Sequence, residues 1–269
     1  ACNVSNCSCA GLRGMRDLSA NAVLDAVAGE LRTARRVLAI TGAGISADSG
    51  LPTYRGIGGL YESDLTEDAM PIEEALSGAM MRARPEVTWK YIHQIESSCR
   101  DKQHNVAHEA LAALESRYER FTVLTQNIDG FHRAAGSNNV IEIHGSVQEL
   151  FCVSCGADRR VQNYAGLEIP PKCDACSGLI RPRVVLFGEL LPEAAIDRLY
   201  AVLDEGVDLV MSIGTTSVFP YIAGPVLQAA RMGLPTVEIN PGDTEVSHLV
   251  RYRIRDRAAV VLPELLKRL

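Results

Sequence analysis

The stretch VLAITGAGISA, residues 37–47, decides how the rest of the chain is interpreted. Its four apolar residues, Val37–Ile40, predict a short buried strand that runs into a turn at Thr41. The glycines at 42 and 44 then match the pattern G-x-G-x-x-A, which is typical of a loop whose backbone comes close to the pyrophosphate of a dinucleotide. One such loop is a weak signal, so its meaning depends on the residues that follow.

The residues after this loop depart from an ordinary dinucleotide-binding unit. Such a unit continues into a helix and a second strand, with an acidic ribose ligand about 20 residues further on. Here Gly50, Pro52 and Gly56 prevent a long helix. We therefore expect residues 48–56 to fold over the ligand, and Asn240, after a later strand, to contact the ribose.

Apolar runs and helix-like segments alternate along most of the chain. The runs are rich in Val, Ile and Leu, which suits parallel strands that are covered on both faces. The alternation predicts the α/β fold class, with a doubly wound, Rossmann-like parallel sheet. Besides Val37–Ile40, the predicted strands are Phe121–Thr125, Val140–Ile143, Val184–Phe187, Leu209–Ile213, Val237–Ile239 and Ala259–Leu262. The predicted helices include Leu24–Arg35, Ala107–Tyr118, Ala194–Asp204 and Pro225–Met232.

Small or polar residues follow six of these predicted strands. Gln126 and Asn127 follow one strand, His144 follows the next, and Gly214 and Asn240 follow two later strands. Ligands of open parallel sheets bind just beyond the carboxyl ends of the strands, so we expect these residues to converge on one cleft. Each of them alone also fits an ordinary turn, because every strand must end in one.

Four of the eight cysteines form two Cys-x-x-Cys pairs, Cys152 with Cys155 and Cys173 with Cys176. Seventeen residues separate the pairs, which is within the spacing of zinc ribbons. Four thiolates make a closed tetrahedral site, so the pattern predicts one structural zinc ion, with disulfides or a chance pattern as the alternatives. Cys2, Cys7 and Cys9 belong to a polar stretch that we expect to be a frayed tail.

Two insertions interrupt the alternating pattern and are predicted to pack together as a smaller domain, helical in part and otherwise a zinc ribbon. The predicted division is a discontinuous, Rossmann-like dinucleotide-binding domain at 20–54, 104–149 and 181–265, a small domain at 55–103 and 150–180, and a tail at 1–19.

Composition and charge exclude several classes of partner. A net charge of −6 does not indicate a general nucleic-acid surface. No apolar run approaches the roughly 20 residues that a membrane span needs, and residues 1–20 lack the apolar core of a secretory signal. Reduced thiols fit a reducing compartment, so the expectation is a cytoplasmic protein. We also expect a monomer, with no specific nucleic-acid partner and no membrane partner.

The motifs occur along the chain in an order that resembles the sirtuin family. The resemblance covers roughly residues 20–265 and is nearest to bacterial sirtuins of the branch that includes succinyl- and malonyl-lysine deacylases. The matching segments are GAGIS at 42–46, PTYRG at 52–56, TQNIDGFH at 125–132, AG at 135–136, HGS at 144–146, the two cysteine pairs, RP at 181–182 leading to FGE at 187–189, and GTTS at 214–217.

This resemblance implies an NAD-dependent protein-lysine deacylase that releases nicotinamide and an O-acyl-ADP-ribose from acylated-lysine proteins or peptides. It implies that His144 is the general base that activates a ribose hydroxyl, since the reference pKa of histidine, about 6.5, leaves it mostly neutral at neutral pH. Asn127 and Asp129 complete the implied catalytic set. The main alternative is a protein mono-ADP-ribosyltransferase. A non-catalytic NAD-binding or acyl-lysine-binding module and a plain NAD dehydrogenase are further alternatives.

The resemblance also implies the residues that hold NAD and the substrate. The implied NAD contacts are Gly42, Ala43, Gly44, Ser46, Asp48, Thr53, Tyr54, Arg55, Gln126, Asn127, Ile128, Asp129, Gly214, Thr215, Thr216, Asn240, Gly242 and Ala258. Val185, Phe187, Gly188 and Glu189 match the segment that pairs with the backbone of a peptide substrate.

Acyl selectivity is expected to depend on the helix after Pro85. The succinyl and malonyl branch uses a Tyr-x-x-Arg pair, which places Tyr91 at the tyrosine and Gln94 at the arginine. Glutamine offers a carboxylate a neutral donor where arginine offers a bidentate charged one. The expectation is a preference for acetyl or other neutral acyl groups.

Overall fold

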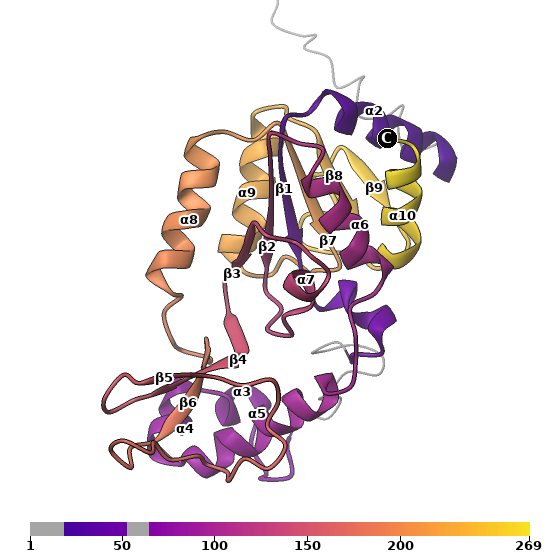
Figure 1. The fold of residues 1–269 in the computed structure, drawn as a ribbon. Coiled ribbons are helices and arrows are strands. Elements are labelled where there is room, and N and C mark those ends of the chain that lie inside the picture. Colours follow the sequence, from indigo (N-terminus) through magenta and orange to yellow (C-terminus); the bar gives the residue numbers. More distant parts are fainter. Residues whose placement is uncertain (1–18, 53–64) are drawn as a thin grey trace, which may run out of the picture.

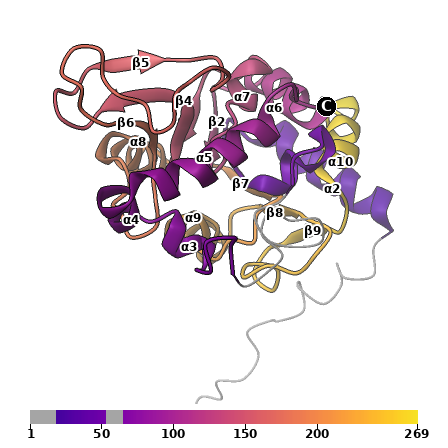
Figure 2. The same ribbon diagram turned by 90° about the horizontal axis from the view of Figure 1, so that it is seen from below.

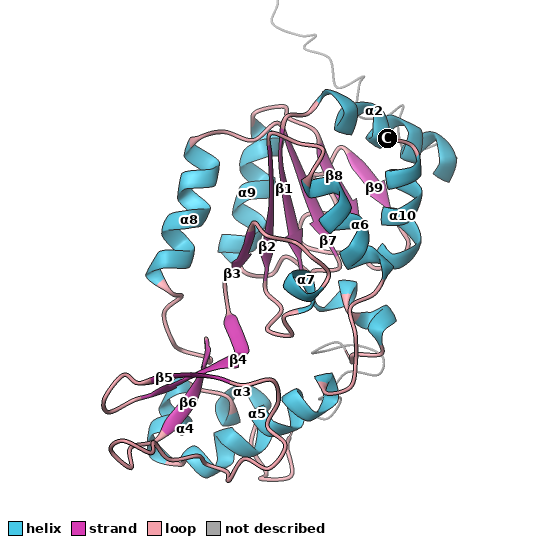
Figure 3. Cartoon of the chain, in the orientation of Figure 1, coloured by secondary structure: helices cyan, strands magenta, loops and turns pink. Residues whose placement is uncertain are grey.

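A computed structural model describes residues 19–52 and 65–269 of the chain. Its centre is a six-stranded sheet with the order β3-β2-β1-β7-β8-β9, and every pair of neighbouring strands is parallel (Figures 1 and 3). The strands are β1 (Arg36–Thr41), β2 (Arg120–Thr125), β3 (Val140–Glu142), β7 (Leu209–Ile213), β8 (Thr236–Ile239) and β9 (Tyr252–Ile254). The predicted α/β class with a Rossmann-like parallel sheet is confirmed.

Helices cover both faces of this sheet because successive side chains of a strand point to opposite faces. In β1, Val37 and Ala39 pack in a cluster with residues of the helices α2, α6 and α10. Leu38 and Ile40 pack on the other face with α8 and α9. All four residues are at most 2% exposed, as the apolar run predicts. The helices are α2 (Ala20–Thr33), α6 (Val106–Glu115), α8 (Glu193–Asp204), α9 (Pro220–Arg231) and α10 (Ala258–Lys267).

A second unit lies beyond the carboxyl edge of the parallel sheet (Figures 1 and 2). Its antiparallel sheet has the order β5-β4-β6, with β4 (Gly145–Cys152) between β5 (Asp158–Arg160) and β6 (Ile180–Val184). Its helices α3 (Ile72–Ala75), α4 (Gly78–Ala83) and α5 (Pro85–Cys99) share one core with that sheet. Trp89, fully buried, donates from its indole nitrogen to the carbonyl of Ile180 at 2.9 Å, which ties α5 to β6.

Short helical elements follow β1 and β2 at the carboxyl edge of the parallel sheet. The turns η1 (Ala43–Ile45) and η2 (Ala47–Ser49) follow β1, and the short helix α7 (Phe131–Ala134) follows β2. The second sheet extends past the division predicted at 149 and 181, since β4 begins at Gly145 and β6 ends at Val184. Within the described ranges, no helix is both long and apolar enough to cross a membrane.

Two of the predicted strands are wrong. Ala259–Leu262 belongs to α10, where the buried residues Ala258, Val261, Leu262 and Leu265 follow helical spacing. A short apolar run fits a buried strand and a buried helix equally well, which explains the error. The sixth strand is β9, which is three residues long and contains a charged residue, so its sequence signal is weak.

The run Val184–Phe187 is the second wrong prediction. Only Val184 is in a strand, and that strand, β6, pairs antiparallel with β4 in the second sheet rather than joining the parallel one. The run is apolar because Val184 and Leu186 pack into the core of the second unit.

Candidate active site at the carboxyl edge of the parallel sheet

The loops after β1 and β7 touch backbone to backbone. A Cβ on Gly44 would lie 2.7 Å from Cα of Gly214, and a Cβ on Gly42 would lie 2.7 Å from Cβ of Thr215. Gly214 has φ +59°, a left-handed conformation that glycine adopts without strain. The glycine pattern therefore has a second cause beside an approach to pyrophosphate, because the two loops need these glycines to pack on each other.

Gln126 and Asn127 connect the loop after β2 to both of these loops. The side-chain amide of Gln126 donates to Oγ1 of Thr215 at 2.7 Å. The amide of Asn127 donates to the carbonyl of Gly42 and to Oγ of Ser46, each at 3.2 Å. The sequence thus predicts correctly that these strand ends come together.

Asp129 lies at the centre of a buried polar group. Its carboxylate accepts from Oγ of Ser46 at 2.8 Å and from the backbone N–H of Phe131 at 2.9 Å. Burial raises the pKa of Asp129, although both hydrogen bonds act in the opposite direction. Behind this group, burial lowers the pKa of His108 to about 4 and that of His132 to about 3, so both imidazoles are neutral near pH 7.

His144 follows β3 and has both ring nitrogens engaged. Its Nδ1 lies 3.0 Å from the carbonyl oxygen of Gln126, and its Nε2 lies 2.7 Å from the hydroxyl of Tyr221. A carbonyl only accepts, so Nδ1 carries the hydrogen and Nε2 has the basic lone pair. Burial lowers the pKa of His144, which keeps the ring neutral and able to take a proton.

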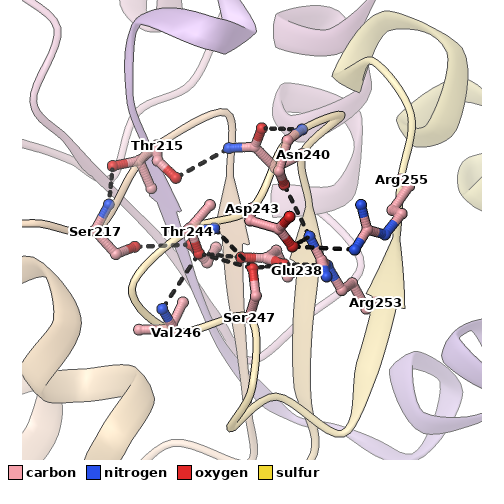
Figure 4. A network of polar contacts seen from close by, with 12 residues as sticks. Thr215, Ser217, Glu238, Asn240, Asp243, Thr244, Val246, Ser247, Arg253 and Arg255 are labelled. Atoms are coloured by element: carbon pink, nitrogen blue, oxygen red, sulfur yellow. Dashed lines mark hydrogen bonds and ion pairs between the residues drawn. The ribbon is translucent and has the colours of Figure 1, made fainter. Parts of the chain in front are cut away.

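Asn240 and Gly242 follow β8 and reach the same edge. The Asn240 amide donates to the carbonyl of Thr215 at 3.0 Å, and its Oδ1 accepts from the backbone N–H of Gly242 at 3.1 Å. Figure 4 shows the polar network beneath this loop. There, the fully buried Glu238 pairs with Arg253 at 2.9 Å and accepts from Ser247 at 2.7 Å. The network holds the Asn240 turn against β9.

The segment predicted to bind the substrate forms hydrogen bonds with other parts of the protein. The backbone N–H of Phe187 donates to the carbonyl of Leu76, and its own carbonyl accepts from Gly78, each at 3.0 Å. Glu189 makes a two-point ion pair with Arg181, at 2.7 and 2.9 Å. Glu189 thus stabilises the turn that contains Gly188. The backbone N–H of Val185 donates to the carbonyl of His144 at 3.0 Å.

Tyr91 and Gln94 both lie on α5, in different surroundings. Tyr91 is 2% exposed and donates from its hydroxyl to the carboxylate of Asp68 at 2.5 Å. The side chain of Lys90 also pairs with Asp68, at 2.9 Å. Gln94 is half-buried. An acyl carboxylate could bond to the Tyr91 hydroxyl only by competing with the negative charge of Asp68.

The remaining predicted NAD residues lie in several parts of the chain. Thr53, Tyr54 and Arg55 lie outside the described residues. Asp48, in η2, pairs with Arg257 at 2.5 Å, which ties the loop after β1 to the start of α10. Ala258 is buried in the first turn of α10, so the segment predicted there as a strand end is a helix start. Of the others, Ala43 begins η1, Ile128 packs against the second core, and Thr216 accepts from the backbone N–H of Glu245.

The four predicted zinc ligands form one cluster in the second unit. Their sulfur atoms all lie within 4.8 Å of one another, with Cys152 and Cys176 3.5 Å apart and Cys155 and Cys173 3.7 Å apart. A tetrahedral zinc ion with Zn–S bonds of about 2.3 Å needs sulfur atoms about 3.8 Å apart, so the cluster fits zinc. None of the cysteines in the described ranges forms a disulfide.

Sequence reasoning missed Tyr221 and Phe219. Their rings stack 5.4 Å apart, and both lie edge-on to His144, with ring centres 5.9 and 6.0 Å from it. The available signal was their position, because the two aromatic residues lie two and four positions after the end of the GTTS segment.

Comparison with known proteins decides the family. The Sir2 family model matches residues 42–220, which is more than half of the chain. The chain belongs to the Sir2 family. A sirtuin of Pseudomonas syringae pv. tomato, named NAD-dependent protein deacylase 2, is 51% identical over 242 residues, 89% of this chain and 97% of the relative. The protein of the same name in Pseudomonas aeruginosa is 50% identical over 241 residues, 88% of this chain and 94% of the relative.

Solved Sir2 structures agree with this assignment. A Sir2 homologue mutant in complex with 2'-O-acetyl ADP ribose superposes with a TM-score of 0.81 at 33% identity, covering 90% of this chain and 94% of that one. A Sir2 complex with a p53 peptide and NAD+ gives a TM-score of 0.78 at 28% identity, covering 90% of this chain and 96% of that one.

Proposed function

We propose that His144 is the general base of this sirtuin, and that the loops after β1, β2, β7 and β8 hold NAD. The activity is NAD-dependent protein deacylation, the activity named for relatives that share half of their residues with this chain, and the proposed acylated side chain is lysine. Bound NAD supplies the ADP-ribosyl group that accepts the acyl group and nicotinamide as the leaving group. The observation that carries the proposal is the neutral His144, with Nδ1 held by Gln126 and the basic lone pair on Nε2.

The other predicted residues have positioning roles in this proposal. Asn127 and Asp129 fix the loop after β2 through Ser46, and Asn240 fixes the loop after β7 through Thr215. Groups that are already bonded in this way need little reorganisation when a ligand binds, which favours fast chemistry. His144 removes a proton from a substrate hydroxyl at Nε2 and retains its hydrogen bond to Gln126 while it does so.

Deacylation is favoured over protein ADP-ribosylation. One solved Sir2 neighbour is a complex with 2'-O-acetyl ADP ribose, a molecule that carries an acyl group on ADP-ribose, as the product of a deacylase does. Another is a complex with a peptide and NAD+, which supports an acylated peptide or protein as the substrate of this chain. A monomeric state, a cytoplasmic location and the absence of nucleic-acid and membrane partners remain predictions.

His144→Ala tests the role of the base. We expect kcat to fall by about 10²–10⁴-fold, because a general base contributes about that much, while the Kd for NAD changes by less than about threefold. Isothermal titration calorimetry measures the second quantity without turnover. The matched control is His248→Ala, which removes an exposed imidazole and leaves both quantities unchanged. Near-normal deacylation by His144→Ala would remove His144 from the mechanism.

A further inference from the structure

Tyr221 is held against the base by a rigid arrangement. It is in the first turn of α9, directly after Pro220, whose ring fixes the backbone at the helix start. Its ring is stacked on Phe219, with only 12° between the two planes. The helix itself is anchored by Ile222 and Val226, both at most 1% exposed in the core beside β7. A swing of Tyr221 away from His144 would disturb this packing.

The hydroxyl of Tyr221 is hydrogen-bonded to Nε2 of His144, the nitrogen at which the base must accept a proton. Nδ1 of His144 is committed to the carbonyl of Gln126, so a proton can be taken only at Nε2. That nitrogen already accepts the Tyr221 hydroxyl, at 2.7 Å. A proton therefore reaches His144 either after Tyr221 has moved away or through the Tyr221 oxygen, and the packing favours the second route.

A tyrosine hydroxyl is suited to this position because it donates and accepts at the same time. Burial raises the pKa of Tyr221 to about 12, so the hydroxyl retains its proton near pH 7 and does not compete with His144 as a charged group. After His144 is protonated, the same oxygen can accept a hydrogen bond from Nε2–H.

We propose that Tyr221 relays the proton between the substrate hydroxyl and Nε2 of His144. Tyr221 accepts the proton of the substrate hydroxyl on its oxygen as it gives its own proton to Nε2. One O–H bond of the substrate breaks, one O–H bond of Tyr221 is replaced by another, and one N–H bond forms on His144. No electrons are transferred between the groups. The inference rests on the proposed role of His144 as the base.

Tyr221→Phe removes the hydroxyl and leaves the stacked ring. We expect kcat for deacetylation to fall at least about tenfold, within the range for loss of a proton-transfer group, with the Kd for NAD within about twofold of the unmodified protein. Tyr200→Phe is the matched control, since it removes an exposed hydroxyl on α8, and it should leave kcat unchanged. A kcat for Tyr221→Phe within about twofold of the unmodified protein would overturn the proposal.

A second measurement needs no ligand. In the free protein with 15N-labelled histidine, Tyr221→Phe should shift the Nε2 resonance of His144 because that nitrogen loses its donor. An unchanged Nε2 resonance would show that the hydrogen bond does not form, and would overturn the proposal.

The double variant His144→Ala, Tyr221→Phe separates the two assignments. If Tyr221 acts through His144, adding Tyr221→Phe to His144→Ala causes no further loss of kcat. A further loss as large as that of Tyr221→Phe alone would show an independent role and would overturn the relay. If His144→Ala itself retains deacylation, the base assignment fails first, and the relay fails with it.

Discussion

The parallel sheet and the second sheet use their polar side chains in different ways. At the carboxyl edge of the parallel sheet, residues from five strand ends bond to one another, and most of them are amides, hydroxyls and imidazoles that can also bond to a ligand. In the second unit, the sulfur atoms of four cysteines lie within 4.8 Å of one another. The first arrangement leaves groups available for chemistry, and the second closes a metal site that has no open position. We therefore expect changes in the two regions to have different effects on the protein.

The largest effect is expected from the cysteine cluster. Cys173→Ala should abolish zinc binding and unfold the second unit, because zinc contributes about 10–16 kcal/mol in small zinc-binding peptides. Deacylation should be lost with it, since the second unit holds the Phe187 turn, and Val185 in the same segment bonds through its backbone to the carbonyl of His144. Elemental analysis and thermal unfolding measure the outcome.

Cys99→Ala is the control for this variant. Cys99 is half-buried at the end of α5 and outside the cluster, so its substitution should leave the zinc content unchanged. Native protein that contains no zinc when prepared without chelators would contradict the structural role of the cluster.

Acid pH should cause a smaller loss of stability, through two histidines at the parallel sheet. The pKa values of His108 and His132 in the folded state, about 4 and about 3, lie below the value of about 6.5 in the unfolded chain. Between these values the unfolded chain binds more protons, so the free energy of unfolding falls as the pH falls below about 6.5. Each histidine contributes up to about 1.4 kcal/mol per pH unit.

Denaturant unfolding between about pH 6.5 and 5 measures this slope. His132→Gln should reduce the slope by the contribution of one histidine, whatever it does to stability at neutral pH. A His132→Gln protein with the full slope would show that His132 titrates normally in the folded state.

The smallest effect concerns the acyl group. We expect a higher kcat/KM for acetyl-lysine than for succinyl-lysine, because Gln94 carries no positive charge and Asp68 lies against Tyr91. A hydrogen bond to a charged group contributes about 1.5–3 kcal/mol, so the preference should be about tenfold to a hundredfold. Gln94→Arg should raise succinyl activity, and Gln94→Met, with no donor, is its control. Equal kcat/KM for both acyl groups in the unmodified protein would contradict the interpretation.

Local patterns were sufficient to predict much of this molecule. The apolar runs that became β1, β2, β7 and β8 lie in the middle of the sheet, where both faces are covered and the sequence signal is continuous. The cysteine spacing fixed the ligand set because two short knuckles need no further partners to close a tetrahedral site.

Features that depend on contacts distant in sequence were missed. β9 is recognisable only through its pairing with β8, and the run at Ala259–Leu262 is short enough to fit either type of element. Tyr221 meets His144 across 77 positions of the chain, and no local pattern around either residue predicts that hydrogen bond. Glu189, predicted to contact substrate, is in an ion pair with Arg181 that only the fold reveals.

Product analysis tests the central claim most directly. An acetylated peptide is incubated with the zinc-loaded protein and NAD, and all products are identified by mass. The account predicts equal amounts of deacetylated peptide, nicotinamide and O-acetyl-ADP-ribose, with no nicotinamide released when the peptide is omitted. A peptide that retains its acetyl group and gains the mass of ADP-ribose would contradict it.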